Sequence, residues 1–383
     1  MHGKTRTIYT SRQDQGNRRR NMIRSWIILI VVVLVAGVVV SSLLRNPGAK
    51  TDIAYSTLPC YPDQDVTPFG DNVLYYDNSH IHCLTSTGAI RWSFPVGEGA
   101  SFSVSDTHIV AWSGPQMRII NSSGISTFDQ RMDETVQFAR VGGNYAAIVM
   151  GPDTDPALLI TDLRGNEIDY EKDAFADKMM MDVGFYGEQG QYLWTLCMDV
   201  YGLKLNTVLN TFQVGKMNTG SVSLGEKLVY KVLFENKRLR VFTTQQLYTY
   251  DYKAVQNAAM TKLVYGWQLI DAGIPARGDA YMLLTPIAQV SGTPAIRELR
   301  LISGDSDRRL ALLKECVGAV IYGNSIYGFN SENIYRSNVN EQRFYSYEMP
   351  IKGTTLTGFL GMCSDGRALL TDGSSVFSVS VPK

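Results

Sequence analysis

The sequence has little of the material from which common active sites are built. It contains four His in 383 residues, no G-x-S-x-G nucleophile elbow, no phosphate-binding P-loop and no G-x-G-x-x-G motif after a strand. The acidic pairs Asp153/Asp155 and Asp305/Asp307 stand in turn-forming sequence and lack the spacing of a calcium loop. We therefore predict that the chain is not an enzyme, has no catalytic, cofactor-binding or metal-ligating residue, and binds no cofactor.

Three of the four histidines have a spacing that could hold a metal ion. His80 and His82 are two residues apart on an expected strand, hence on one face of it, and His108 occupies a similar place one unit later. Because zinc takes three or four convergent ligands, Asp77 or Asp106 would have to complete the site. We favour the alternative that these are polar residues at turns and strand ends.

Cysteine is scarce and scattered. The five residues, Cys60, Cys83, Cys197, Cys316 and Cys363, include no C-x-x-C pair. A disulfide-scaffold protein has a denser set in an even number. We expect buried free thiols that act as small apolar residues. A single bridge between Cys60 and Cys83 is the alternative.

Net charge is also absent, because 36 basic and 36 acidic residues cancel, but the balance is uneven along the chain. Seven Lys and Arg precede position 26 and only Asp14 opposes them, so the remainder is mildly acidic, which argues against nucleic-acid binding. Trp26–Leu44 holds no charge and no Pro. As a helix rising ~1.5 Å per residue it reaches ~28 Å, about the thickness of a hydrocarbon core.

The basic residues before this apolar run predict a cytoplasmic N-terminus and an extracytoplasmic C-terminal domain at the cell membrane. The chain then divides into a disordered basic tail (1–25), an uncleaved transmembrane signal-anchor helix (26–44), a short linker (45–51) and a large domain (52–383). A cleaved signal peptide is the competing interpretation, but the run is longer than a usual signal core and no A-x-A site follows. Gly37 and Ser41 have a small-xxx-small spacing, which leaves dimerisation of the helix open.

Beyond the linker the sequence consists of short apolar strands separated by polar turns. A unit of four strands, with a polar hairpin such as Ser86-Thr87-Gly88 before the last, recurs eight times at roughly 42 residues, within the range of propeller blades. We therefore predict an all-β, eight-bladed (alternatively seven-bladed) β-propeller preceded by the single transmembrane helix.

The eighth unit ends one strand short, after Val376–Val381. Residues 53–58 lie before the first unit's opening strand, Val66–Gly70, where a fourth strand belongs in the repeat. We expect 53–58 to complete the last blade, because ring closure removes free sheet edges. Two longer intervals, around 169–181 and 252–276, should carry insertions.

The pattern LTSTGAIRWSFPVG (Leu84–Gly97) resembles one repeat of the quinoprotein-like (PQQ-like) propellers, in which a turn Gly precedes a Trp. Phe128 and Tyr170 stand near the Trp position in the next two units. The layout of basic tail, anchor and degenerate eight-unit ring resembles uncharacterised membrane-anchored propeller families of Gram-positive bacteria, which are domains of unknown function. The resemblance implies a fold and a cell-envelope location and no activity. A quinone cofactor is not expected, because the Trp recurs poorly.

These features predict a membrane-anchored, non-enzymatic binding or scaffold module at the cell envelope, with a protein or cell-wall ligand and no nucleic-acid partner. One alternative is an envelope sensor or assembly factor that works through the cytoplasmic tail. The other is a quinoprotein-like or hydrolytic enzyme. The sequence identifies neither the ligand nor the oligomeric state.

Overall fold

The computed structural model describes residues 52–383, except 187–188, 217, 236, 276–277 and 288–294. The predictions for the tail, the transmembrane helix, the linker and the Gly37/Ser41 pair lie outside the described residues. Within the described part, no helix is long and apolar enough to cross a membrane.

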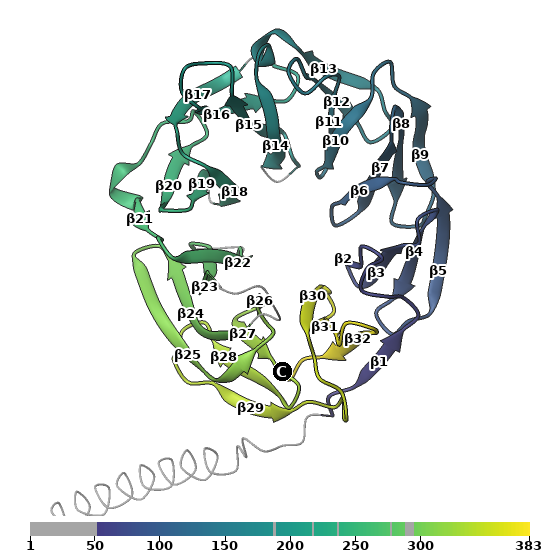
Figure 1. Ribbon diagram of the computed structural model, residues 1–383, viewed down its shortest axis with the longest axis vertical. Helices are drawn as coiled ribbons and strands as arrows, with labels where there is room; N and C mark the ends of the chain where they lie inside the picture. The colour runs from purple at the N-terminus through teal and green to yellow at the C-terminus, as the bar shows by residue number, and fades with distance from the viewer. Residues whose placement is uncertain (1–51, 187–188, 217, 236, 276–277, 288–294) are drawn as a thin grey trace, which may run out of the picture. The chain divides into compact units, whose positions relative to one another are not determined.

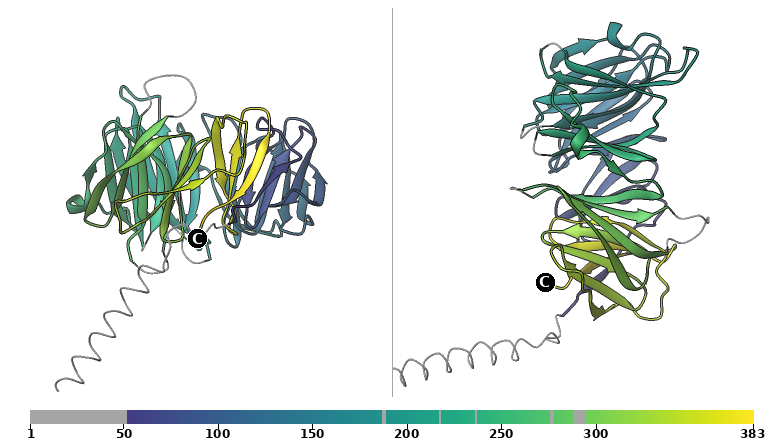
Figure 2. Two further views of the ribbon diagram at one scale, coloured as in Figure 1. Left: turned by 90° about the horizontal axis from the view of Figure 1, so that it is seen from below. Right: turned by 90° about the vertical axis from the view of Figure 1, so that its left-hand side faces the viewer.

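Ile53–Lys383 is one compact unit made of eight four-stranded antiparallel sheets arranged in a ring (Figure 1). The all-β, eight-bladed propeller is therefore confirmed, and the seven-bladed alternative is wrong. We name the strands of each blade A to D from the central channel outward. Figure 2 shows the ring edge-on, with the strands running between its two faces. One face carries the A–B and C–D turns and the other carries the B–C turns and the connections between blades.

The first four blades follow the chain in order. Blade one has β2 (Thr67–Phe69), β3 (Asn72–Tyr76), β4 (His80–Thr85) and β5 (Ile90–Pro95). Blade two has β6 (Ser101–Val104), β7 (His108–Ser113), β8 (Gln116–Asn121) and β9 (Ser126–Arg131). Blade three has β10 (Val136–Val141), β11 (Tyr145–Met150), β12 (Ala157–Asp162) and β13 (Glu167–Glu171). Blade four has β14 (Met179–Tyr186), β15 (Tyr192–Asp199), β16 (Asn206–Gln213) and β17 (Asn218–Gly225).

The remaining blades continue the same order. Blade five has β18 (Val229–Glu235), β19 (Arg238–Thr243), β20 (Gln246–Asp251) and β21 (Lys262–Leu263). Blade six has β22 (Trp267–Gly273), β23 (Tyr281–Pro286), β24 (Ile296–Ser303) and β25 (Ser306–Cys316). Blade seven has β26 (Gly318–Tyr322), β27 (Ser325–Phe329), β28 (Asn333–Asn338) and β29 (Tyr345–Glu348). Blade eight has β30 (Gly358–Met362), β31 (Arg367–Thr371), β32 (Val376–Ser380) and β1 (Tyr55–Leu58). Short 3₁₀ helices, η1 (Asp173–Phe175) and η2 (Ala258–Met260), occupy the two intervals expected to carry insertions.

The middle strands read as continuous apolar runs because both of their faces are covered. In β7 the four central residues, Ile109 to Trp112, are all buried, and in β12 the first five are. The outer strands have one face on the rim, so β5 and β9 carry mostly exposed or half-buried residues. A stack of sheets packed face to face requires this difference between inner and outer strands.

In the described part of the chain, clusters of buried apolar side chains fill the eight junctions between neighbouring blades. At the junction of blades eight and one, Leu58 and Leu369 pack with Val73 and Leu84. Fully burying a side chain of this size contributes about 1.5–3 kcal/mol. Each junction therefore adds several such side chains to the stability of the ring.

The strand expected over 53–58 forms over Tyr55–Leu58 and pairs antiparallel with β32, which places the start and the end of the domain side by side (Figure 1). Tyr55 lies opposite Val379 and Leu58 opposite Val376. The Ser380 N–H adds a bond to the Ala54 carbonyl at 2.9 Å. Blade eight thus takes three strands from the end of the chain and one from its beginning.

Candidate functional site

The structure brings Asp77 and His82 together and adds a residue that the sequence did not point to. His82 Nε2 lies 2.7 Å from Asp77 Oδ2, and His82 Nδ1 lies 2.6 Å from Ser93 Oγ. The ring of His80 lies 5.9 Å from that of His82, while Asp106 belongs to the A–B turn of blade two and His108 to its B strand. No three His, Cys, Asp or Glu side chains among the described residues are grouped to hold a metal ion.

The row from Asp77 to Ser93 resembles a catalytic relay in composition. An ionised Asp77 accepts the Nε2–H of His82, which leaves Nδ1 free to accept the hydroxyl proton of Ser93. Although burial opposes it, hydrogen bonds from His82 and from the N–H groups of His80 and Ser79 lower the pKa of Asp77. The row lies on the outer strands of blade one, and its residues line neither of the cavities described below. We therefore assign it to fixing the B–C turn, which Asp77 closes.

One carboxylate of each acidic pair contacts a cation. Asp155 lies 3.2 Å from Lys172 Nζ. Asp307 accepts two bonds from the guanidinium of Arg300, at 2.8 and 2.7 Å. Asp155 lies in the connection between β11 and β12, as expected of a turn residue, whereas Asp307 belongs to β25 and pairs across the hairpin with Arg300 of β24, so the expectation of a turn residue is wrong for Asp307.

All five cysteines are buried and free. The alternative of a Cys60–Cys83 bridge is therefore wrong for this structure. Cys60 belongs to the cluster between blades eight and one, and Cys83 to the cluster between blades one and two. Burial raises the pKa of Cys60 and of Cys83 to about 11.

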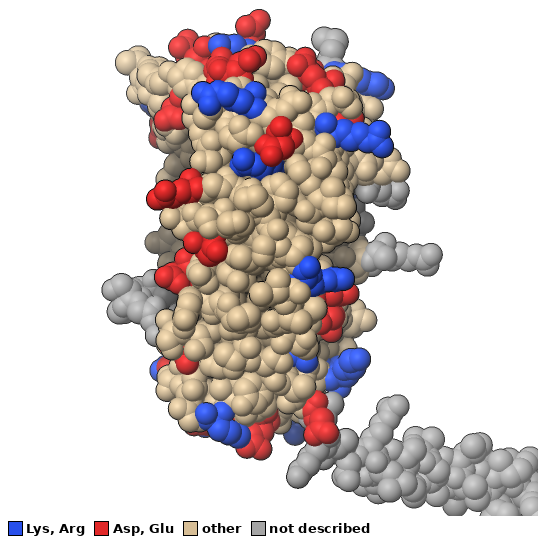
Figure 3. Space-filling model, turned by 90° about the vertical axis from the view of Figure 1, so that its right-hand side faces the viewer, with Lys and Arg blue, Asp and Glu red and all other residues tan. Residues whose placement is uncertain are grey.

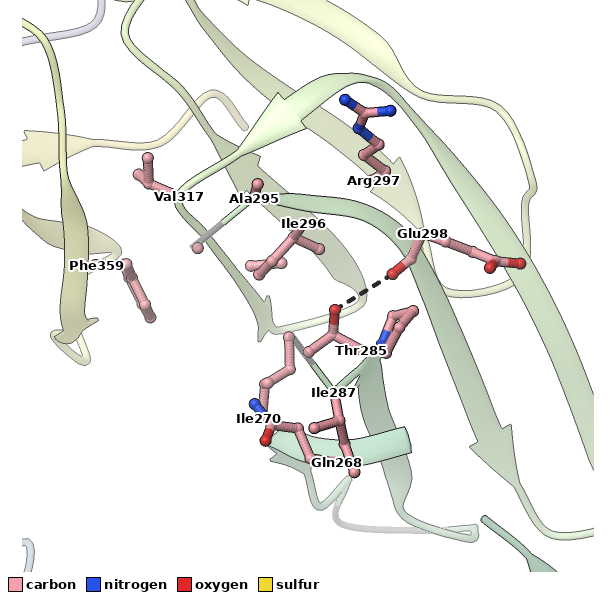
Figure 4. Close-up of a pocket in the computed structure, with 13 residues that line it drawn as sticks. Gln268, Ile270, Thr285, Ile287, Ala295, Ile296, Arg297, Glu298, Val317 and Phe359 are labelled. Atoms are coloured by element: carbon pink, nitrogen blue, oxygen red, sulfur yellow. Dashed lines mark hydrogen bonds between the residues drawn. The ribbon is translucent and has the colours of Figure 1, made fainter. Parts of the chain in front are cut away.

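Blades six, seven and eight surround an open pocket of about 530 Å³ on the B–C face (Figure 4). Its lining comes from the starts of β22, β24, β26 and β30 and from the end of β23. The walls are mainly aliphatic and aromatic and include Ile270, Ile287, Ile296, Val317 and Phe359. Ile287 is 45% exposed and forms part of the lip, whereas Ile296 is 9% exposed. Three consecutive blades thus supply one apolar concavity.

The aromatic wall of this pocket is held in place by its neighbours. The ring of Phe359 stacks on that of Phe329 in blade seven, with centroids 5.4 Å apart and planes at 12°. A Cβ at position 318 would lie 2.2 Å from the Phe359 Cβ, so only Gly318 leaves room for the ring. Packing of this kind fixes the shape of the pocket before any ligand arrives.

Three of the four polar side chains that line the pocket, those of Thr285, Arg297 and Glu298, are engaged with protein groups, and the fourth is that of Gln268. Thr285 Oγ1 donates to the Glu298 carbonyl at 3.5 Å, the bond drawn in Figure 4. The Arg297 guanidinium pairs with Glu315 at the rim, and the Glu298 carboxylate lies 3.8 Å from Arg309. The pocket therefore offers apolar surface and presents no unpaired charge, an arrangement that suits an apolar group.

Sequence reasoning did not find this pocket. Ile270, Ile296 and Phe359 stand in apolar strand patterns that are indistinguishable from core positions, and their meeting depends on the ring. On the rim, the view in Figure 3 shows acidic and basic side chains interspersed rather than gathered by sign.

No family model matches the sequence, and no curated protein matches it. Among solved structures, the chain is similar to BamB from Moraxella catarrhalis, with 10% identity, 86% of this chain and 100% of that chain covered and a TM-score of 0.51. It is also similar to the WD40 domain of Neurospora crassa Pan2 (9% identity, 86% and 96% covered, TM-score 0.49) and to apo AztD from Citrobacter koseri (13%, 76% and 86%, TM-score 0.48). The likeness to BamB supports the β-propeller fold and nothing finer.

Proposed function

We propose that this chain is a non-enzymatic binding or scaffold module whose pocket between blades six, seven and eight takes an apolar segment of a partner protein. The observation that carries the proposal is the open apolar pocket with the exposed Ile287 at its lip. The propeller fold is consistent with such a role, because propellers present concave surfaces at the mouths of a rigid ring.

The composition of the pocket favours a protein partner over a cell-wall glycan. A sugar needs hydrogen-bond partners for its hydroxyl groups, and burying these groups unpaired costs free energy. Thr285, Arg297 and Glu298 are engaged with protein partners, Gln268 is the one remaining polar side chain of the lining, and the rest of the wall is largely Ile, Val and Phe. A Leu, Ile or Phe side chain would bury its surface there without that cost.

We further propose that residues 26–44 anchor the propeller in the cell membrane with the ring outside, as in the membrane-anchored propeller families that the chain resembles. The chain enters the ring at Ala54, beside Ser380 and the A–B turn that contains Gly366. The pocket opens on the B–C face.

The pocket is tested by photo-crosslinking in living cells from position 287. A photoreactive amino acid replaces Ile287, and the control replaces Ile125, an exposed isoleucine at the C–D turn of blade two. We expect a protein adduct from position 287 and none from position 125. Equal adducts at both positions, or none at either, would refute the pocket as the binding site.

The anchor has its own test. The full chain should fractionate with membranes, and a C-terminal tag should be accessible to protease added outside the cell. A soluble, shortened chain would contradict the anchor and leave the pocket proposal standing on its own test.

A further inference from the structure

A second cavity of about 520 Å³ lies on the side of the ring that carries the A–B turns, also between blades six, seven and eight. Its walls include Asp271 from β22, Ile321 and Tyr322 from β26, and Phe359 and Met362 from β30. Asp271 is the only carboxylate in this lining, and the lining holds no Lys or Arg. We propose that the cavity binds an organic cation, an ammonium or guanidinium group, with Asp271 as its counter-ion and the rings of Tyr322 and Phe359 as aromatic walls.

A carboxylate in an equivalent position elsewhere in the ring has an internal cation. In blade four, Asp182 follows the bulge of its A strand and lies 3.0 Å from the Arg140 guanidinium of blade three. Asp271 follows the matching bulge in blade six. Arg140 stands two residues after Phe138, the first paired residue beyond the bulge of β10. In β18 of blade five the same position is occupied by Leu233. The repeat thus supplies the counter-ion for Asp182 and omits it for Asp271.

Asp271 is partly compensated by backbone groups. Its Oδ2 accepts the Ile321 N–H at 2.6 Å, which ties the A strands of blades six and seven together. No ion pair involves it among the described residues. Burial raises its pKa, and the N–H groups of Ile321 and Ala272 oppose that rise. A half-buried carboxylate without a cation is costly to keep, and such groups are concentrated at functional sites.

The other walls suit a cation as well. Aromatic faces attract ammonium and guanidinium groups through the ring quadrupole. Tyr322 donates its hydroxyl to the Ser364 carbonyl at 2.9 Å, which fixes the ring. Burial raises the pKa of Tyr322, and the nearby carboxylates of Asp365 and Asp71 add to that rise. Arg367, the basic residue near Cys363, is turned towards Ser378 of β32.

The site predicts a direction for pH dependence. The cation binds the ionised carboxylate, so affinity falls as pH drops through the raised pKa of Asp271. The other titratable groups in the lining are Tyr322 and Cys363, whose pKa values burial raises, in Cys363 to about 12. Neither of these groups changes charge between pH 4 and pH 8.

The test is calorimetric titration of the full chain with agmatine, and separately with the peptide acetyl-Gly-Arg-Gly-amide, at low ionic strength. Wild type should bind at least one probe at one site. Asp271→Asn should weaken that binding at least tenfold, because the amide keeps the acceptor for Ile321 and loses the charge. Asp305→Asn removes the same charge from an exposed turn of blade six and should bind as wild type does. Binding of agmatine alone indicates a free amine as the ligand, and binding of the peptide alone indicates a basic side chain.

Two further variants test the site independently of Asp271→Asn. Met362→Lys places a cation in the same cavity and should abolish binding with Asp271 intact, should Asp271→Asn fail to fold. Arg277, which lies outside the described residues, is the basic residue nearest to Asp271 in the sequence. Binding that appears only in Arg277→Gln would mean that the chain fills its own site, and would overturn an external ligand. No binding in any variant, or equal binding by wild type and Asp271→Asn, would overturn the site itself.

Discussion

The indole Nε1 of Trp92 donates a hydrogen bond to the Ser122 carbonyl, 3.1 Å away in the C–D turn of the next blade. The same ring covers Gly124, where an added Cβ would lie 2.6 Å from it. One outer-strand side chain therefore holds the turn of the following blade by a polar bond and by packing.

Other junctions use the same contact with different residues. Thr127 Oγ1 donates to the Leu163 carbonyl between blades two and three, and Thr219 Oγ1 donates to the Tyr252 carbonyl between blades four and five. Phe128 covers Gly165 much as Trp92 covers Gly124. The chemistry changes from junction to junction while the place of contact is kept, which is why the Trp signature fades in the sequence.

Replacing Gly124 by Ala should destabilise the ring at this contact. Its φ of +77° costs an L-residue about 1–2 kcal/mol, and the clash with Trp92 adds roughly 1–3 kcal/mol. Gly97→Ala is the matched control, since Gly97 has a φ of +93° and nothing within 4 Å of an added Cβ. Urea unfolding should show a clearly larger loss for Gly124→Ala, and equal losses would contradict the packing role of Trp92.

The closing strand β1 should contribute to the free energy of unfolding of the ring. Leu58 is 4% exposed and packs at the junction of blades eight and one, so Leu58→Ala is expected to cost about 2–5 kcal/mol. Tyr55, on the same strand, is 48% exposed, and Tyr55→Ala should cost far less. The melting temperatures of the two variants compare them directly. A Leu58→Ala protein as stable as wild type would mean that the ring does not depend on β1.

The thiols provide a simple chemical check. Burial raises the pKa of all five cysteines, to about 11 in Cys197 and about 12 in Cys316, so at pH 8 they are protonated as well as covered. A disulfide-exchange reagent should react with none of them in the native protein and with five after unfolding in urea. A count of three in urea would indicate the Cys60–Cys83 bridge.

A buried ion pair within blade five is hydrogen-bonded to blade six. The guanidinium of Arg240 donates to Glu235, both residues are 2% exposed, and Glu235 Oε2 accepts the Ala280 N–H at 2.6 Å. Arg240→Met should cost about 3–5 kcal/mol, because it leaves a buried carboxylate without its cation. Lys314→Met breaks an exposed pair with Glu332 and should cost far less, because solvent screens the two charges. Denaturant unfolding of the two variants distinguishes them, and similar costs would contradict this account.

The ring could be predicted from the sequence because each blade is built mostly from neighbouring strands of the chain. A recurring turn explains this: Asn121 Oδ1 accepts the N–H groups of Ser123 and Ile125, and Asp162 and Asp251 bind the corresponding groups in blades three and five. An Asn or Asp three residues before a turn residue of positive φ, Gly124 and Gly165 in blades two and three and Ala254 in blade five, is therefore a sequence signal of the repeat. In blade three the contact with the next blade falls on Ile168, which lies beside Gly215, rather than on Tyr170.

The candidate sites were less accessible to sequence reasoning. Ile287, Ile296 and Phe359 come from two blades and form a pocket only through the curvature of the ring. The sequence offers one weak signal for Asp271, which is the one acidic residue in the strand WQLIDAG. Its missing counter-ion becomes visible only when Asp182 and Arg140 show what the repeat provides elsewhere.

The affinity for the partner captured at position 287 tests the central claim most directly. Calorimetry on the purified full chain would compare wild type with Ile287→Asp and with Ile125→Asp, which carry the same change on exposed isoleucines of opposite faces. If the pocket holds an apolar segment, Ile287→Asp should weaken binding about ten- to thirtyfold, the size expected when a central contact of an interface is lost, and Ile125→Asp should bind as wild type does. Unchanged binding by Ile287→Asp, or equal weakening by both variants, would contradict the assignment of the pocket.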